Sequence, residues 1–249
     1  MIKYSGDVPC EDFSDFTRID FQFDGRDAVL VAPNEAVATP KWLLKTEYFG
    51  AYPAVEVEML KRGWHVAYLK NRNRWGLDED MDDKRAFADY LHDRHSLYTK
   101  CVPVGLSAGG LHAIKLAAKY PEMVSALYLD APAVNLLSIL NFSGSCPGNV
   151  GVKEEVLNAL NLTLSELISY REHPLDKLPA LVANKIPVIL VYGAADRVCL
   201  YPENGALLVK AYEGMGIALE VYGKEGCDHH PHGLDDPAPI INFILNHAE

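Results

Sequence analysis

Residues 100–112 read KCVPVGLSAGGLH, and this stretch decides the fold of the chain. Its apolar run at 101–104 is typical of a buried strand, and the pattern of residues 111–120 is helical. Between them lies a G-x-S-x-G pentapeptide centred on Ser107. A serine on such a sharp strand-to-helix turn has its hydroxyl exposed above the sheet, and small neighbours let strand and helix approach closely. The stretch therefore predicts a strand, a tight turn that exposes Ser107, and a helix.

Strand-like and helix-like segments alternate on both sides of this stretch. The chain opens with a predicted β-hairpin, whose strands at 18–23 and 28–32 flank an Asp24-Gly25 turn. Further strands are expected at 64–69, 124–129, 186–192 and 217–222, and further helices at 54–62, 80–98, 153–160, 164–170, 203–212 and 239–246. This alternation favours right-handed βαβ crossovers and a mainly parallel sheet with helices on both faces.

Two segments fit neither pattern. Residues 34–52 are interpreted as a long loop rich in aromatic side chains, which is typical of a functional or packed loop. Residues 133–184 are too long for one crossover, and we interpret them as a small cap inserted between strands. Thr163 and Glu166 predict a capping box within that cap. No repeat or linker divides the sequence, so we expect residues 1–249 to form a single domain.

Composition and charge narrow the classes of partner. The chain has 249 residues, and its formal net charge of −11 argues against nucleic acid and anionic membranes as partners. No segment approaches the roughly 18 apolar residues of a membrane helix. The first 20 residues lack the pattern of a signal peptide, so we expect a cytoplasmic protein. Five scattered cysteines without a C-x-x-C spacing are interpreted as free thiols.

Residues capable of chemistry follow several of the expected strands. Ser107 follows one strand, Asp196 follows a later one, and His229, His230 and His232 follow the last. Ligand sites in parallel sheets gather at the carboxyl ends of the strands. We therefore expect a serine, an acid and a histidine to meet at one edge of the sheet.

Three motifs give the chain a resemblance to the α/β-hydrolase superfamily, from residue 18 to the final helix. They are the pentapeptide around Ser107, the GAAD at 193–196 with Pro202 after it, and the DHHPH at 228–232 with Asp236-Pro237 after it. The last motif departs from the superfamily's G-H-x-P-H pattern by an aspartate in place of glycine and by one extra residue before the proline. The resemblance implies an α/β-hydrolase fold, a catalytic triad in the order serine, acid, histidine, and no cofactor.

A narrower resemblance concerns bacterial carbohydrate esterases and lipases. It rests on the loop at 40–42, the LDAP at 129–132 and the HHPH at 229–232. This likeness implies a small ester as substrate, with an acyl group on a carbohydrate as the first expectation.

The chemistry of ester cleavage assigns a role to each candidate. A serine hydroxyl becomes a good nucleophile when an imidazole takes its proton, and we expect His229 to be that base for Ser107. Asp196 would hold the tautomer of the histidine. An oxyanion hole needs two N–H donors. Ala108 would supply one, and the loop after the strand at 28–32 would supply the other, from Glu35 or Ala36.

Several alternatives stay open at this stage. Ser107 could be only a helix N-cap, and Asp196 could be only the start of a helix. Asp130 is a rival acid, although a loop-stabilising role suits it better. His230 and His232 are alternative bases. The three histidines with neighbouring aspartates also suit a metal, but adjacent histidines point in different directions, so no metal is expected.

Five side chains on loops are candidates for substrate binding, namely Trp42, Tyr48, Arg72, Arg74 and Trp75. They could stack on a sugar or clamp an acidic group, or they could simply pack loops and carry solvated charge. We predict a serine esterase that cleaves a small carboxylic ester, first of all an acylated sugar, through an acyl-enzyme. A peptidase or lipase with the same triad, and a binding protein that kept the fold without turnover, are the alternatives.

Overall fold

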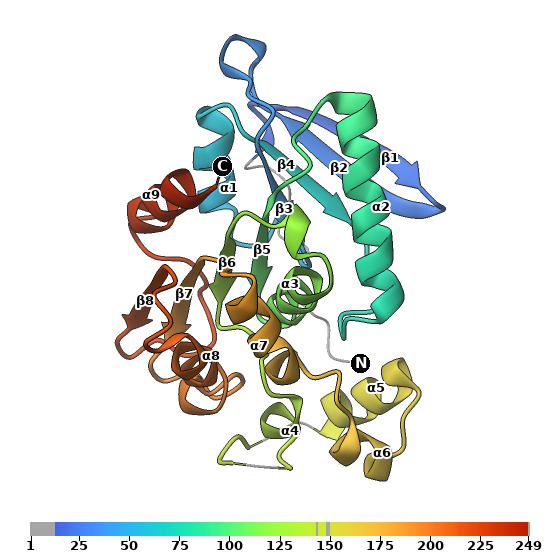
Figure 1. The fold of residues 1–249 in the computed structure, drawn as a ribbon, viewed down its shortest axis with the longest axis vertical. Coiled ribbons are helices and arrows are strands. Elements are labelled where there is room, and N and C mark those ends of the chain that lie inside the picture. Colours follow the sequence, from blue (N-terminus) through green and yellow to red (C-terminus); the bar gives the residue numbers. More distant parts are fainter. Residues whose placement is uncertain (1–12, 143, 148–149, 249) are drawn as a thin grey trace.

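The structure is a computed structural model, and it describes residues 13–142, 144–147 and 150–248. The strands within these residues are β1 (Thr17–Phe23), β2 (Arg26–Ala32), β3 (Trp42–Lys45), β4 (His65–Leu69), β5 (Val102–Leu106), β6 (Leu127–Asp130), β7 (Val188–Gly193) and β8 (Leu219–Lys224). They form one sheet in the order β1-β2-β4-β3-β5-β6-β7-β8 (Figure 1). β2 pairs antiparallel with both β1 and β4, and all other neighbours are parallel. The predicted mainly parallel sheet is confirmed.

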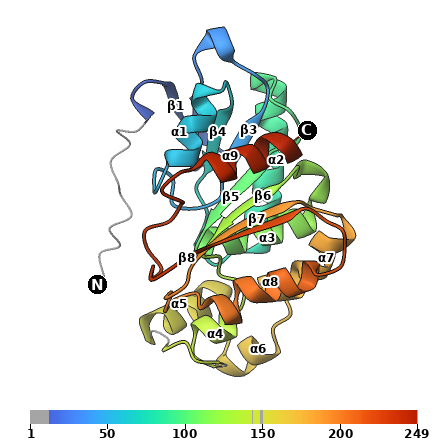
Figure 2. The same ribbon diagram turned by 90° about the vertical axis from the view of Figure 1, so that its left-hand side faces the viewer.

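Helices connect the strands and cover both faces of the sheet. Those of the described residues are α1 (Ala54–Lys61), α2 (Asp78–His95), α3 (Ala108–Lys119), α4 (Leu136–Ile139), α5 (Val150–Leu160), α6 (Leu164–Ser169), α7 (Pro174–Ala183), α8 (Gly205–Tyr212) and α9 (Ala238–His247). α1 and α9 cover one face, and α2, α3, α7 and α8 cover the other (Figure 2). Successive residues of β2 show the alternation, because Leu30 belongs to one core cluster and Val31 to the other.

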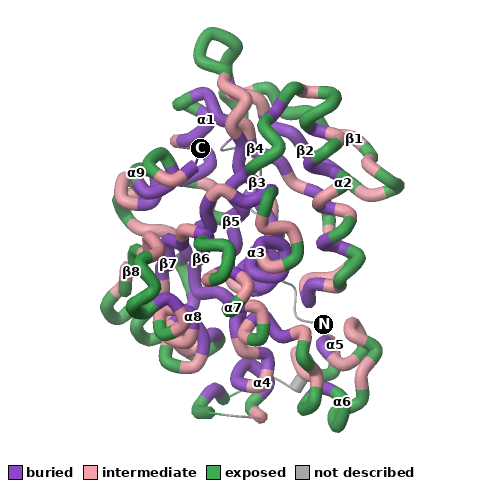
Figure 3. Tube along the Cα trace, viewed as in Figure 1, coloured by how far each residue is buried: buried purple, intermediate pink, exposed green. Residues whose placement is uncertain are grey.

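Burial increases from the edges of the sheet toward its centre. All five residues of β5 are buried, whereas β1 and β8 at the edges are largely exposed or half-buried (Figure 3). Strands covered by helices on both faces are apolar along their whole length, which explains the apolar run that precedes Ser107. The turn at Ser107 therefore leaves the sheet at its centre, between β3 and β6.

The prediction of a loop over 34–52 is wrong, because this segment contains the central strand β3. Leu43 and Leu44 are fully buried, and the ammonium of Lys45 is buried against the Glu56 carboxylate at 2.5 Å. β3 is only four residues long and ends on a lysine, so its sequence lacks the apolar run typical of a buried strand. The prediction of an oxyanion donor after the strand at 28–32 follows from the same omission of β3, since that strand is β2.

The insertion between β6 and β7 forms a small cap. α4, α5 and α6 lie together at one end of the molecule (Figures 1 and 2). They share a small apolar cluster that includes Ile139, Val156 and Leu167. The predicted range of 133–184 is too wide at its end, because Leu178 and Leu181 of α7 pack in the core of the sheet. The predicted capping box at Thr163 is confirmed.

A few sequence expectations fall partly outside the described residues. Most of the N-terminal segment and Cys10 lie there, whereas Cys101, Cys146, Cys199 and Cys227 are free thiols. No helix in the described part of the chain is long and apolar enough to cross a membrane.

Candidate active site

The turn between β5 and α3 holds Ser107 in a conformation that few side chains adopt. Its φ is 53° and its ψ is −120°, which is strain of about 1–3 kcal/mol that the surrounding fold must impose. The backbone N–H of Ser107 donates to the Asp130 carbonyl at 2.9 Å. A Cβ on Gly105 would lie 2.6 Å from the Cα of Gly110, so glycine is required where strand and helix meet. The turn is thus fixed by its neighbours on both sides.

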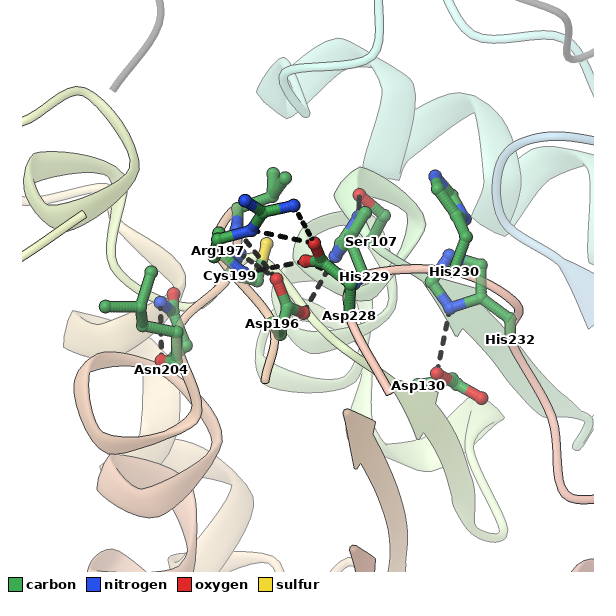
Figure 4. Close-up of polar contacts among 12 residues, drawn as sticks. Ser107, Asp130, Asp196, Arg197, Cys199, Asn204, Asp228, His229, His230 and His232 are labelled. Carbon is green, nitrogen blue, oxygen red and sulfur yellow. Dashed lines mark hydrogen bonds and ion pairs between the residues drawn. The ribbon is translucent and has the colours of Figure 1, made fainter. Parts of the chain in front are cut away.

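Ser107, His229 and Asp196 are brought together in one line of hydrogen bonds (Figure 4). His229 Nε2 lies 2.9 Å from Ser107 Oγ, and His229 Nδ1 lies 2.8 Å from Asp196 Oδ2. Both His229 and Asp196 are buried. The three side chains come from loops after β5, β7 and β8, at the carboxyl edge of the sheet.

Asp196 is held in its charged form by donors on three sides. Its Oδ1 accepts the backbone N–H groups of Val198 at 2.7 Å and Cys199 at 2.9 Å. Burial by itself raises the pKa of Asp196, but the His229 ring and these two N–H groups outweigh it, so the pKa lies below its ordinary value. A charged Asp196 keeps the proton of His229 on Nδ1 and leaves Nε2 free to accept from Ser107.

Asp228, directly before His229, accepts hydrogen bonds from two loops of the site. Its carboxylate accepts the backbone N–H of His229 at 2.8 Å and the backbone N–H of Arg197 at 3.0 Å. The Arg197 guanidinium adds an exposed ion pair at 2.5 Å, and it lowers the pKa of Asp228 to about 2. The aspartate therefore connects the loop of the acid to the loop of the histidine.

A second aspartate–histidine pair lies beside the first. His232 Nδ1 lies 2.8 Å from Asp130 Oδ1, and the N–H of Gly233 donates to Asp130 Oδ2 at 2.6 Å. Burial raises the pKa of Asp130, but these contacts outweigh it and the pKa is lowered. Asp130 thus contacts His232 rather than His229, which agrees with its interpretation as a loop-stabilising residue. His230 stacks on Tyr52.

A cavity of about 660 Å³ opens above Ser107. Most of its lining is apolar, with Tyr48, Ala51, Tyr52, Trp75, Leu106, Ala108, Ala133, Ile139, Cys146, Pro147, Val152, Val198 and Cys199 around the serine. Arg74, Arg197, Asp228 and the three histidines supply its polar groups. The arrangement can expose an ester carbonyl to Ser107 while a mostly apolar group fills the cavity.

The predicted substrate-binding residues divide into two groups. Tyr48, Arg74 and Trp75 line the cavity. The assignment of Trp42 is wrong, because its ring is buried in the core and its Nε1 donates to the Tyr98 carbonyl at 2.8 Å. Arg72 lies outside the lining and pairs with Asp80 and Asp83 of α2.

Arg74 and Trp75 are also joined to the cap. Arg74 Nε and Nη2 donate to the two oxygens of Glu155 at 2.8 and 2.5 Å, and Trp75 Nε1 donates to Glu155 Oε1 at 3.0 Å. Glu155 belongs to α5, so one carboxylate holds the cap against the loop after β4.

Of the expected oxyanion donors, Ala108 remains a candidate, whereas Glu35 and Ala36 do not. Ala108 lines the cavity at the first turn of α3, next to Ser107. The assignment of Glu35 and Ala36 is wrong, because β2 runs antiparallel to β4 and its end lies at the amino edge of the sheet. Thr39 lies at that edge, because its N–H donates at 2.8 Å to the carbonyl of Gly63, just before β4.

Several residues that line the cavity are not among the residues predicted from the sequence. Tyr52, Ile139, Val198 and Cys199 all contribute to it. Val198 and Cys199 lie two and three residues after Asp196, so their closeness to the predicted acid could have indicated a place in the site. Ile139 reaches the cavity only through the fold of the cap, and nothing in its local sequence indicates this.

Comparison with known proteins places the fold. No family model matches the chain. A curated relative, the monoacylglycerol lipase of Mycolicibacterium smegmatis, is 25% identical in an alignment of 227 positions that covers 80% of this chain and 80% of that protein. Est1E from Butyrivibrio proteoclasticus superposes with a TM-score of 0.65 at 16% identity, over 92% of this chain and 98% of that one.

Larger peptidases share the same fold. Dipeptidyl peptidase 4 of Porphyromonas gingivalis superposes with a TM-score of 0.69 at 15% identity, over 93% of this chain. The chain spans only 35% of that peptidase's length. The chain therefore shares the α/β-hydrolase fold of these proteins.

Proposed function

We propose that the protein is a serine esterase that cleaves small carboxylic esters with Ser107, His229 and Asp196 as its triad. The observation that carries the proposal is the line of hydrogen bonds from Ser107 Oγ through His229 to Asp196, which opens into the cavity. Neither a metal nor a cofactor is needed for this reaction.

The proposed reaction has two halves. Ser107 Oγ attacks the ester carbonyl carbon while His229 Nε2 takes the hydroxyl proton, and the carbonyl electron pair moves to oxygen. Collapse of this oxyanion breaks the bond to the alcohol, which leaves with the proton from His229. Water then attacks the acyl-enzyme by the same route and releases the acid and free Ser107.

The proposed oxyanion hole combines Ala108 with the loop after β3. In α/β-hydrolases the second N–H donor comes from this loop. Thr46 fixes the loop to α3, because its Oγ1 donates to the Gly109 carbonyl at 2.7 Å. Tyr48 is the next residue of the loop that lines the cavity, and its φ is 55°. We therefore assign the second donor to the loop after β3, in place of Glu35 or Ala36.

The cavity supports an apolar acyl group more directly than it supports a sugar. Trp75 and Tyr48 offer rings for a sugar alcohol, so an acylated carbohydrate stays the first proposed substrate. The mostly apolar lining favours a second candidate, an acylglycerol, and the curated relative is named a monoacylglycerol lipase.

Covalent labelling separates an enzyme from a silent binding protein. A fluorophosphonate probe should label the intact chain at Ser107, as mapped by peptide mass spectrometry, and Ser107→Ala should remain unlabelled. Absence of label on the folded wild-type protein would exclude the esterase proposal.

A substrate panel then separates the candidates. Acetylated sugars, monoacylglycerols, aryl esters and aminoacyl amides should be compared by kcat/KM on the same protein. Preference for either of the first two identifies the class of alcohol. Preference for the amides would show a peptidase with the same triad.

A further inference from the structure

Three histidine rings of the last loop form a compact corner at the cavity. The ring centroids of His229, His230 and His232 lie 4.8, 5.2 and 4.9 Å apart in pairs, and the rings are nearly perpendicular to one another. Three imidazoles on one zinc ion, with Zn–N bonds of about 2.0–2.1 Å, have centroids about 5 Å apart. The spacing of the rings therefore already suits a shared ion.

The two buried rings are held by carboxylates through their Nδ1 atoms. Asp196 holds His229 and Asp130 holds His232, each at 2.8 Å. A metal-bound histidine typically donates its other ring N–H to such a carboxylate, which fixes the ring and strengthens its free nitrogen as a ligand. These carboxylates also place negative charge behind the corner, while Arg197 is paired with Asp228.

We propose that this corner binds Zn²⁺ and that the bound ion inhibits the enzyme. The ligand nitrogens lie within 4.8 Å of one another, so the most distant of them must approach by about 1.5 Å to reach tetrahedral geometry. His230 is exposed and can supply this movement. The rings do point in different directions, as expected, yet one nitrogen of each lies close enough to the others to reach a common ion after this movement.

Inhibition follows from the double use of His229. Its Nε2 lone pair accepts from Ser107 at 2.9 Å, and a metal ion needs the same lone pair. Zn²⁺ and proton abstraction from Ser107 are then mutually exclusive. This consequence rests on the proposed function, whereas binding of the ion does not.

Two measurements test the proposal. Zn²⁺ binding to Ser107→Ala is followed by calorimetry in metal-free buffer, and ZnCl₂ is titrated into p-nitrophenyl acetate hydrolysis by the wild type. We expect one ion per chain and inhibition that EDTA reverses, with Mg²⁺ having no effect. Removing a ligand through His230→Gln should weaken binding at least about tenfold, whereas His95→Gln at the end of α2 should leave it unchanged.

The outcomes are distinct for the two proposals. Absence of Zn²⁺ binding to folded Ser107→Ala, or equal binding by His230→Gln, overturns the metal site. Activation of the wild type by Zn²⁺ overturns inhibition. Zn²⁺ binding that depends on His230, in a protein without fluorophosphonate labelling, keeps the metal site and rejects the esterase.

Discussion

Asp196 is charged at a position that solvent scarcely reaches, and its donors determine this. Two backbone N–H groups occupy one oxygen and the His229 ring occupies the other. An asparagine at position 196 could keep one oxygen as acceptor for the backbone N–H groups, but it would turn its N–H₂ group toward the His229 ring. The histidine would then take the wrong tautomer, with its proton facing Ser107.

Asp196→Asn should therefore lower kcat by about 10⁴-fold while the fold is retained. Steady-state kinetics on an aryl ester measure the loss, and circular dichroism checks the fold. A loss below tenfold would show that another group orients His229.

The two histidine pairs give opposite expectations for alanine variants. His229→Ala should abolish hydrolysis down to the level of Ser107→Ala, because base and nucleophile act as one unit. His232→Ala should retain measurable turnover, since its ring contacts Asp130. Measuring kcat for both variants against the double variant tests this, and a complete loss in His232→Ala alone would assign the base to His232.

At the level of elements, the end of β7 touches the loop after β8. A Cβ on Gly193 would overlap the Asp228 carbonyl oxygen and lie 2.6 Å from that of Cys227. These carbonyls belong to the loop that carries His229, so any side chain here pushes that loop away from Ser107.

Gly193→Ala should lower the free energy of unfolding by about 1–3 kcal/mol and reduce kcat as well. Urea denaturation and kinetics measure the two effects. Reduced stability with unchanged kcat would mean that the loop moves without displacing the His229 ring.

The cap depends on one carboxylate for its contact with the loop after β4. Glu155 is partly exposed, so its pair with Arg74 contributes about 1 kcal/mol or less. Loss of up to about 1 kcal/mol changes an equilibrium by about fivefold, so Glu155→Gln should raise KM for apolar acyl esters a few-fold. Because the cap is then held less firmly, proteolysis within α5 should also become faster. The neighbouring exposed Glu154→Gln is the matched control, and equal behaviour of both variants would contradict a role for the contact.

The elements were predicted from sequence where their pattern is long or local. β5, its turn and α3 occur in one stretch, so Ser107 and Ala108 could be placed from residues 100–112. β3 could not, because four residues with a buried lysine resemble a loop until Glu56 is seen beside Lys45. The loop that supplies the second proposed oxyanion donor could not be predicted either, because its position depends on the order of strands in the sheet.

At the scale of the whole molecule, acid acts on the carboxylates that link distant loops. Asp130 and Asp196 have lowered pKa values in the folded state. The unfolded chain therefore takes up their protons at higher pH than the folded chain, so this stability is present above the ordinary value of 3.8 and is lost as the pH falls through the lowered values.

Asp130→Asn should consequently make the acid loss of stability shallower, by up to about 1.4 kcal/mol per pH unit below pH of about 4. Urea denaturation between about pH 3 and pH 7 gives the slope, and Asp20→Asn on the exposed edge strand β1 is the control. An unchanged slope would show that the pair of Asp130 with His232 is equally strong when protonated.

The three tryptophans lie in two different environments, so their fluorescence reports two different events. All are buried, but Trp42 and Trp64 lie together near Tyr98, whereas Trp75 lines the cavity. Emission from the first two reports unfolding. Emission from Trp75 reports what enters the cavity and whether Glu155 stays bound to it. Trp75→Phe should thus abolish ligand-induced quenching without removing the unfolding signal, which makes the protein its own fluorescent sensor for candidate substrates.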